Sequence, residues 1–549
     1  MPSEPPATIA ELVAARAADA RPGLTFEGHT WTWGEVAAQM HSRARLLLAH
    51  RGSGPPHVGV LLANVPEYVF LLGGAALAGS TLVALNSTRS ATELARDVAA
   101  TDCAVVVGET AQLDLLTAVA GGRQILLTDD DGYVAALADL SGSPAPARAA
   151  ASADLLLLLF TSGSTGAPKA VRVSQGRAAT AAAGMRLRPD DVLYCAMPLF
   201  HGNALLAVLL PALGSGVPVV LRRRFSAAAF LPDVRAHGCT FTSTVGRALS
   251  YVLATPATTD DRDHRLRAVL APESSGTDAV AFRERFGCAV LTGYGSSENA
   301  VVLVPRPGHP PDALGLPPDG SDVAVIDPVT RCECPRANFD AGGRLLNADD
   351  AIGEIVGRDA LARFEGYYGN PEAMAERTRD GWYWTGDLGY RDAAGVFFFA
   401  GRTTDWLRVD GENFAAAPVE RLLARCPGVS GVAVLGVPDE RTADDQVLAV
   451  LEVAAPAAFD AAAFDAFLDA QPDLGSKWRP RYVRVLAALP VGPTDKVDRA
   501  GLRAQRWGGP DPVFWRPDRR GALTPLAGPA VEELRRRFIE HGRSAALQH

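Results

Sequence analysis

The stretch that decides the fold is Asp154-Leu-Leu-Leu-Leu-Leu-Phe-Thr-Ser-Gly-Ser-Thr-Gly-Ala-Pro-Lys169. The apolar run 155–160 has the length and the abrupt end of a strand buried in a sheet. Two glycines in the following loop allow a tight turn and a close approach of backbone N–H groups to a ligand. Hydroxyl groups and a lysine complete a loop that suits a polyphosphate. The predicted phosphate-binding residues are Thr161, Ser162, Gly163, Ser164, Thr165, Gly166 and Lys169.

This loop differs from the usual P-loop. Ala167 and Pro168 separate the last glycine from Lys169, and no Ser or Thr follows the lysine. Lysine is rare in this chain. Of the 53 basic residues, only residues 169, 477 and 496 are lysine. An ammonium is a compact point charge and a guanidinium is a planar fork. Since arginine is used in place of lysine at almost every basic position, we expect the three remaining lysines to be needed for chemistry.

Composition limits the classes of protein to consider. At 549 residues the chain is too long for one hydrophobic core, so we expect at least two domains. A net charge of −9 argues against a nucleic-acid partner, since such proteins usually carry a basic surface. The N-terminal residues do not resemble a signal peptide, and no stretch reaches the roughly 18 apolar residues that span a membrane. The sequence predicts a cytoplasmic protein without a transmembrane segment, whose seven cysteines are reduced and mostly buried.

Strands and helices alternate along the first part of the chain, as in a parallel sheet covered by helices. The elements expected there include strands 58–62, 81–85, 104–107 and 124–127 and helices 66–77, 94–100 and 113–120. The pattern changes after residue 403 to helix 418–425, strands 431–436 and 446–453, helix 460–469 and strand 481–486. After about residue 505 we expect an irregular tail and then a helix at 530–541. The fold class is α/β: a large N-terminal domain of several subdomains with βαβ sheets, and a small α+β C-terminal domain.

Two further stretches place polar side chains after expected strands. His201 follows strand 192–197 beside a glycine and an asparagine, either as a pocket residue or as a hydrogen-bonded structural histidine. Residues 290–299, Val-Leu-Thr-Gly-Tyr-Gly-Ser-Ser-Glu-Asn, enter a Gly-X-Gly turn. Tyr294 between the glycines can lay its ring on a base, and Glu298 can hold Mg²⁺ among phosphate oxygens. A plain hairpin turn is the alternative.

Three residues of the second half are also candidates. Asp387 follows a Thr-Gly turn, where it can accept two hydrogen bonds from a ribose diol or form an Asx turn. Arg402 ends the strand that begins near Phe397 and suits a phosphate or a ribose. Lys496 lies in a turn-rich loop, from which a mobile lysine can reach a distant site.

Five motifs stand in a fixed order: Thr-Ser-Gly-Ser-Thr-Gly-Ala-Pro-Lys, Tyr-Gly-Ser-Ser-Glu, Thr-Gly-Asp, Gly-Arg-(x)₃-Trp and Pro-Thr-Asp-Lys. Together they resemble the adenylate-forming superfamily of acyl-CoA synthetases, peptide-synthetase adenylation domains and luciferases. Within it, the stretches Arg408-Val-Asp-Gly-Glu-Asn-Phe-(x)₅-Glu420 and Asp511-Pro-Val-Phe-Trp resemble the branch of long-chain acyl-CoA synthetases and fatty-acid-transport proteins.

The resemblance implies a division at about Arg402. An adenylation domain, 1–402, would hold ATP and the acid, and a domain, 403–549, would carry Lys496 and rotate between two half-reactions. In the first, a carboxylate attacks the α-phosphate of ATP and gives an acyl-adenylate and pyrophosphate. In the second, CoA or another acceptor displaces AMP. ATP, Mg²⁺ and CoA are the implied cofactors and co-substrates, a small-molecule acid is the implied substrate, and a homodimer is the candidate assembly.

The same resemblance assigns roles to the nucleotide site. Residues 161–169 would hold the β,γ-phosphates, and Tyr294 would stack on adenine. Ser297 would contact the α-phosphate, and Glu298 would act in catalysis as the Mg²⁺ ligand.

The remaining roles concern the ribose and the acid. Asp387 and Arg402 would hold the ribose. His201 would lie near the carboxylate as a catalytic residue. Lys496, the catalytic lysine, would bridge the carboxylate and the α-phosphate during adenylation and withdraw before the thiol attacks.

Two positions depart from the family pattern. Thr404 stands where many relatives carry the Asp or Lys of the hinge, so the pivot of the rotation is less defined by the sequence. Asp495 replaces the usual glycine before Lys496. Asp tolerates a left-handed backbone better than most residues, and it sets a carboxylate beside the lysine.

The expected activity is ATP-dependent activation of a fatty or aromatic acid followed by transfer to CoA. An alternative keeps the fold but changes the oxyacid or the acceptor: carrier-protein loading, an amide ligase, or a diazotase that activates nitrite with ATP. A non-catalytic binding relative is a third hypothesis, and the intact candidate residues argue against it. Fold alone does not choose among these, because the substrate is set by the pocket.

Overall fold

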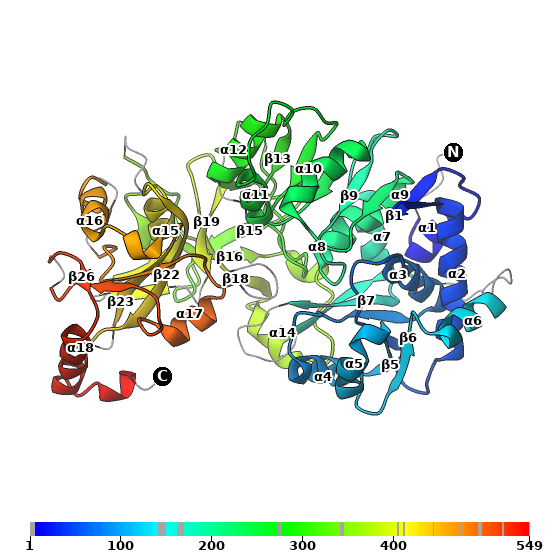
Figure 1. Cartoon of the computed structure of the whole chain (residues 1–549), viewed down its shortest axis with the longest axis horizontal. Helices are drawn as coiled ribbons and strands as arrows, with labels where there is room; N and C mark the ends of the chain where they lie inside the picture. The colour runs from blue at the N-terminus through cyan, green and yellow to red at the C-terminus, as the bar shows by residue number, and fades with distance from the viewer. Residues whose placement is uncertain are drawn as a thin grey trace. The chain divides into compact units, whose positions relative to one another are not determined.

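The computed structural model describes residues 6–140, 150–161, 169–272, 274, 276–306, 308–310, 312–340, 345–402, 406–409, 412–442, 444–471, 474–475, 477–491, 497–518 and 521–547. The chain divides into two compact units (Figure 1). The first unit holds residues 1–312 and 359–382, and the second holds residues 313–358 and 383–549. The expected functional boundary at residue 402 stays a prediction.

One sheet of the first unit has seven strands in the order β13-β12-β11-β9-β10-β1-β2. All neighbouring pairs are parallel except the β1–β2 hairpin. The strands are β1 (Pro22–Phe26), β2 (His29–Thr32), β9 (Leu193–Cys195), β10 (Val219–Leu221), β11 (Phe241–Ser243), β12 (Ala268–Leu270) and β13 (Ala289–Leu291). The helices of this part are α1 (Ile9–Arg16), α2 (Trp33–Ala49), α7 (Gln175–Ala183), α8 (Gly202–Ala204), α9 (Leu210–Ser215), α10 (Ala227–Ala236), α11 (Gly246–Leu253) and α12 (Gly276–Phe286), with a π-helix at Leu205–Leu209.

The second sheet of this unit contains the strand that decides the fold. Its order is β6-β5-β3-β4-β7-β8, and only β8 runs antiparallel to its neighbour. Its strands are β3 (His57–Val60), β4 (Thr81–Ala84), β5 (Cys103–Gly108), β6 (Gln124–Leu127), β7 (Leu155–Thr161) and β8 (Lys169–Ser174). The associated helices are α3 (Pro66–Ala78), α4 (Ala91–Ala100), α5 (Leu113–Ala120), α6 (Asp131–Asp139) and α14 (Pro371–Arg377).

Burial explains the unbroken apolar run in β7. Residues 156–159 are at most 1% exposed, because a strand inside a parallel sheet is covered on both faces. Leu94 of α4 and Leu116 of α5 pack in one cluster with Val106 of β5 and Leu158 of β7. The prediction of a parallel sheet covered by helices is confirmed, and β6 and α5 have the expected bounds.

The second unit begins with an antiparallel sheet in the order β14-β19-β18-β16-β15. Its strands are β14 (Ala313–Gly315), β15 (Val323–Ile326), β16 (Gly353–Gly357), β18 (Trp382–Arg391) and β19 (Phe397–Arg402), with the short helix α13 (Ala348–Ala351) before β16. A two-residue strand, β17 (Thr378–Arg379), precedes β18, and the hairpin β20 (Trp406–Val409) and β21 (Glu412–Ala415) follows β19.

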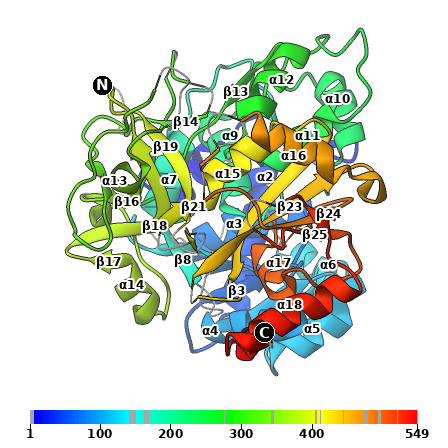
Figure 2. The same ribbon diagram turned by 90° about the vertical axis from the view of Figure 1, so that its left-hand side faces the viewer.

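A mixed five-stranded sheet, β22 to β26 in sequence order, forms the rest of this unit. Its strands are β22 (Val429–Pro438), β23 (Asp445–Val453), β24 (Tyr482–Leu486), β25 (Val513–Trp515) and β26 (Thr524–Pro525), and its helices are α15 (Ala416–Leu423), α16 (Ala461–Asp469), α17 (Arg499–Gln505) and α18 (Pro529–Glu540). Side chains alternate along β22, so Val434 packs with α15 and α16 while Leu435 packs with α17 and α18. Figure 2 shows the two pairs of helices on opposite sides of the sheet.

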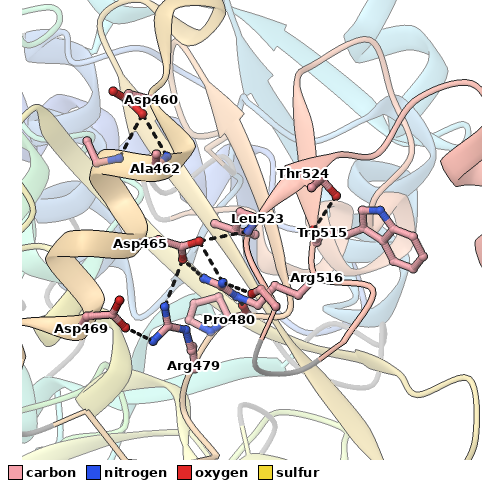
Figure 3. A network of polar contacts seen from close by, with 12 residues as sticks. Asp460, Ala462, Asp465, Asp469, Arg479, Pro480, Trp515, Arg516, Leu523 and Thr524 are labelled. Carbon is pink, nitrogen blue, oxygen red and sulfur yellow. Dashed lines mark hydrogen bonds and ion pairs between the residues drawn. The ribbon is translucent and has the colours of Figure 1, made fainter.

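The prediction of an irregular tail after residue 505 is wrong in part. Residues 513–515 form β25, which pairs with β24 and β26, and only the helix near 530–541 had been expected. A network of charges around the buried Arg516 secures this segment to α16. Asp465 accepts hydrogen bonds from Arg516, from Arg479 and from the backbone N–H of Leu523 (Figure 3). A three-residue strand held by such contacts leaves no periodic pattern in the sequence.

All seven cysteines are free thiols, and all except Cys332 are buried, as the sequence predicts. Burial raises the pKa of the Cys195 thiol to about 12, which makes the thiolate scarce at neutral pH.

Within the described ranges, no helix has both the length and the apolar composition needed to cross a membrane.

Candidate active site

A switch in strand order places the candidate residues of the first unit at one edge. The carboxyl ends of β9, β11, β12 and β13 meet there because these strands are parallel. The chain leaves β9 toward β10 but leaves β11 toward β12, so the connections diverge between β9 and β11. Ligands of open α/β sheets bind in the crevice at such a switch point. The loop after β9 carries His201, and β11 ends at Ser243, so both residues lie beside it.

His201 stands at the start of an irregular helical segment. It is the residue before α8, and its ring centroid lies 4.6 Å from that of Phe200. A π-helix, Leu205–Leu209, follows directly. Turns of this type are rare and often occur at functional sites. His201 therefore follows a strand, as expected, whereas its place in a pocket and its chemical role stay predictions.

A glycine brings two of the predicted motifs together. A Cβ atom on Gly202 would lie 3.3 Å from Oγ of Ser297 and 3.2 Å from Cδ1 of Leu159. The loops after β9 and β13 therefore approach each other closely at the end of β7. A side chain at residue 202 would push these segments apart.

The wall beside the switch point is polar. Ser243, which is 1% exposed, donates a 2.5 Å hydrogen bond to Oδ1 of Asn203, and Nδ2 of Asn203 donates to the carbonyl of Thr244 at 3.3 Å. Ser274 follows β12 at the same edge, and its Oγ is buried without a hydrogen-bond partner among the described residues. These groups offer a hydroxyl to a polar atom of a ligand.

Asn64 is a structural residue of the site that motif reasoning missed. It is 4% exposed and braces the loop before His201. Its Nδ2 donates to the carbonyls of Met197 and Arg222 at 2.9 and 3.1 Å, and its Oδ1 accepts from the N–H of Leu199 at 2.8 Å. The one sequence signal was that Asn64 interrupts the apolar stretch 58–85.

The two ends of the predicted phosphate loop lie opposite each other. Thr161 and Lys169 are direct partners in the antiparallel pair β7–β8. The Lys169 side chain is 3% exposed, and its Nζ lies 2.8 Å from Oε2 of Glu376 on α14. Nζ also lies 6.0 Å from the ring centroid of Tyr367. Hydrogen bonding and charge from Lys169 lower the pKa of the Glu376 carboxyl.

Glu298, the predicted metal ligand, is buried and hydrogen-bonded. It is 8% exposed, and its Oε1 accepts a 3.0 Å hydrogen bond from the hydroxyl of Tyr367. Arg177 donates to the carbonyl of the preceding Ser297, which fixes the loop. Mg²⁺ bound with a nucleotide usually takes one or two carboxylates and completes its shell with phosphates and water. Glu298 fits that pattern, and no cluster of three or more metal-ligating side chains occurs among the described residues.

Tyr294 lies in the hairpin that the sequence offered as an alternative. Its N–H and C=O both pair with Leu303, at 3.0 and 2.9 Å. The turn includes Asn299, whose φ is +53°, and the N–H of Asn299 donates to the carbonyl of Ser296. The hairpin therefore presents Tyr294, Ser297 and Glu298 together, so hairpin and site are compatible.

The candidate ribose residues are neighbours in the second unit. Asp387 of β18 and Arg402 of β19 are direct Cα partners across the two strands. The expected Thr-Gly turn before Asp387 is wrong. Glu354 and Val356 pair with Leu388 and Trp384, so three residues of β18 oppose Ile355 alone. This is a bulge in a continuous strand, with φ of +74° at Gly386, and bulges often re-aim a side chain next to active sites.

Several predicted residues lie outside the described part of the chain: Ser162, Gly163, Ser164, Thr165, Gly166 and Lys496. The same holds for Thr404 and Asp495, and for Arg402 only the backbone is described.

A family comparison decides the assignment. The model of the AMP-binding enzyme family matches residues 11–368. The chain belongs to the AMP-binding enzyme family. The predicted adenylate-forming family is thereby confirmed.

Similar proteins of this family are CoA ligases. A Rhodococcus jostii protein named steroid-22-oyl-CoA synthetase is 48% identical over 515 residues, which is 92% of each chain. A Mycobacterium tuberculosis protein named medium/long-chain-fatty-acid–CoA ligase FadD17 is 40% identical over 518 residues, covering 92% of this chain and 98% of that one. The crystal structure of ATP-bound MatB from Rhodopseudomonas palustris superposes with a TM-score of 0.78 at 25% identity, covering 90% of this chain and 98% of that one.

These likenesses confirm the predicted class of activity. This AMP-binding enzyme is an AMP-forming ligase that activates a carboxylic acid with ATP as an acyl-adenylate and transfers it to CoA. Ligases of this kind use ATP, Mg²⁺ and CoA. Sequence reasoning did not find Tyr367 and Glu376, which contact the predicted residues from distant parts of the chain.

Proposed function

We propose that this ligase activates a bulky carboxylic acid such as a steroid carrying a side-chain carboxylate. The observation that carries the proposal is the 48% identity, over 92% of each chain, with a protein named steroid-22-oyl-CoA synthetase. A medium- or long-chain fatty acid is the nearest alternative acid, because the FadD17 proteins are 40% identical.

The polyphosphate end of ATP is assigned to Lys169 and Glu298. Lys169 holds the β,γ-phosphates, and Glu298 holds the Mg²⁺ that neutralises charge developing on the phosphates. Burial of both side chains supports these roles, since charges act more strongly where water is excluded. Ser297 contacts the α-phosphate, and Tyr294 stacks on the adenine.

The ribose is assigned to two residues of the second unit. Asp387 and Arg402 hold the ribose diol, and their pairing across β18 and β19 supports a joint role. Residues 403–549 form a domain that rotates between the half-reactions and delivers Lys496 for adenylation. Its withdrawal gives the thiol of CoA access to the adenylate.

The acid is assigned to the crevice between β9 and β11. His201 lies near its carboxylate, while the loops after β11 and β12 line the rest. The π-helix and the switch in strand order support this placement.

A second candidate keeps the fold and the adenylating step but activates nitrite, whose adenylate an arylamine then attacks. One observation favours it: Asn203 and Ser243, which are hydrogen-bonded to each other beside the switch point, are polar side chains. An aryl acid loaded onto a carrier protein and an amide ligase are further outcomes that the same assay separates.

Pyrophosphate release from the purified full-length chain tests these proposals. The substrates are a steroid with a side-chain carboxylate, a long-chain fatty acid, an aryl acid, and nitrite with an arylamine, each with and without CoA. We expect the steroid acid with CoA to give the highest turnover and an acyl-CoA product. Turnover with nitrite and arylamine, but with none of the carboxylic acids, would reject the proposed steroid substrate. A Lys169→Ala variant is the control for pyrophosphate release by the adenylation site. The homodimer stays a prediction, which sedimentation of the same sample checks.

A further inference from the structure

The buried lysine assigned to the phosphates of ATP already has an anionic partner. Nζ of Lys169 lies 2.8 Å from Oε2 of Glu376. The Lys169 side chain is 3% exposed, whereas that of Glu376 is 47% exposed. The pair joins the first residue of β8 to the last turn of α14, 207 residues apart in the chain.

Electrostatics make this contact exchangeable. A buried ammonium requires a partner, so Lys169 needs an anion whether or not a nucleotide is bound. A phosphate that reaches Nζ would come close to the Glu376 carboxylate, and like charges at such distances repel. Glu376 can give way at little cost, because about half of its side chain already faces water. Its place in the last turn of α14 also disfavours a negative charge, since the carbonyl end of a helix is negative.

A neighbouring aromatic ring keeps the lysine in place during such an exchange. The ring centroid of Tyr367 lies 6.0 Å from Nζ of Lys169, which is within the range of a cation–π contact. The hydroxyl of the same residue donates to Glu298. The ring of Tyr367 is therefore a neutral neighbour that can stay near the ammonium while its anionic partner changes.

We propose that Glu376 is an exchangeable counter-ion of Lys169 that competes with the pyrophosphate end of the nucleotide. It leaves Lys169 when ATP binds and returns as pyrophosphate departs, which weakens product binding and speeds release. The proposal rests on the phosphate-binding role assigned to Lys169 under the proposed function. Glu376 is a positioning residue, because it acts through Lys169 and touches no reacting atom.

The test compares inhibition by Mg²⁺-pyrophosphate in wild type, Glu376→Gln and Glu372→Gln. Glu372 lies in the first turn of the same helix and is exposed, so it controls for the loss of one surface charge. We expect Glu376→Gln to lower the inhibition constant of pyrophosphate roughly five-fold. The reason is that the variant removes the half-exposed ion pair that competes with pyrophosphate for Lys169. The KM for ATP falls with it, and Glu372→Gln leaves both constants unchanged. Pyrophosphate should also raise the melting temperature of Glu376→Gln more than that of wild type, because it restores a partner to Lys169.

Two further variants keep the outcomes separate. Glu376→Asp, which shortens the side chain, serves if Glu376→Gln does not fold, and it should shift the inhibition constant in the same direction. Lys169→Ala should weaken inhibition by pyrophosphate. An unchanged constant in Lys169→Ala would overturn the phosphate role of Lys169 itself. If inhibition by pyrophosphate weakens in Lys169→Ala but the inhibition constant of Glu376→Gln is unchanged or raised, only the proposed exchange of Glu376 for pyrophosphate is overturned.

Discussion

The hydroxyl of Tyr367 donates a 3.0 Å hydrogen bond to Oε1 of Glu298, and both side chains are buried. Groups that hydrogen-bond a metal-ligating carboxylate fix its orientation, and their removal typically costs roughly ten- to a hundred-fold in metal affinity. We therefore expect Tyr367→Phe to raise the Mg²⁺ concentration for half-maximal pyrophosphate release by about ten-fold. Initial rates across a Mg²⁺ titration at saturating ATP measure this shift.

The adjacent tyrosine is a matched control. Tyr368 donates from its hydroxyl to Oδ2 of Asp102, away from Glu298, so Tyr368→Phe should leave the Mg²⁺ dependence unchanged. Equal Mg²⁺ dependence of Tyr367→Phe and wild type would remove Tyr367 from the metal site.

The residues that sequence motifs predicted and those they missed differ in a physical way. The strand 155–161, the loop after β9 and the hairpin around Glu298 follow from local composition, because burial and turn chemistry act over a few residues. Tyr367 and Glu376 reach their partners across 69 and 207 residues, and nothing in the local sequence encodes those contacts. The bulge before Asp387 was missed for a related reason. A Thr-Gly pair favours a turn, but pairing with β16 and β19 holds the segment in a strand.

The brace formed by Asn64 makes a prediction about stability and acid binding. Asn64→Ala removes three hydrogen bonds and leaves buried backbone groups without them, so we expect a loss of about 3 kcal/mol in the free energy of unfolding. Because the braced loop leads to His201, the KM for the acid should rise several-fold while the KM for ATP changes less. Denaturant unfolding and steady-state kinetics measure the two effects.

Asn86 offers the comparison for this variant. It follows β4 as Asn64 follows β3, but among the described residues its side chain accepts from the N–H and hydroxyl of Thr88 alone. Asn86→Ala should cost about 1 kcal/mol and leave the KM for the acid unchanged. A rise in that KM for both variants would show that the effect is not specific to the brace.

The Asp465–Arg516 network predicts a pH dependence of stability. Burial opposes ionisation of Asp465, but hydrogen bonds from Arg516 and Leu523 outweigh it, so the pKa of Asp465 is lowered on folding. The stabilisation is therefore present above the pKa of the unfolded chain, near 4, and is lost as pH falls through the lower folded pKa. Asp465→Asn leaves the 1%-exposed Arg516 without its carboxylate and should cost about 3–5 kcal/mol at pH 7.

A neighbour on α16 separates this effect from loss of a surface charge. Asp469 pairs with Arg479, but its side chain is 66% exposed, so Asp469→Asn should cost at most about 1 kcal/mol. Unfolding of the full chain by urea at pH 7 and at about pH 3, below the unfolded pKa of Asp, measures both variants. The Asp465→Asn penalty should shrink at the lower pH, and a penalty independent of pH would contradict the network's ionic character.

The bulge in β18 predicts that a backbone change alone impairs nucleotide binding. Gly386 has a φ of +74°, which an L-residue adopts at a cost of roughly 1–2 kcal/mol, so Gly386→Ala should relax the bulge and move the adjacent Asp387. We expect the KM for ATP to rise by about ten-fold, because losing one hydrogen bond to the ribose weakens ATP binding by about this factor. Gly381 has a φ of +76° with nothing near its Cβ position, so Gly381→Ala adds the same strain in a turn before β18. Both variants should lose similar stability in denaturant unfolding, and only Gly386→Ala should weaken ATP binding. Equal KM values for ATP in the two variants would show that the bulge does not position Asp387 for the ribose.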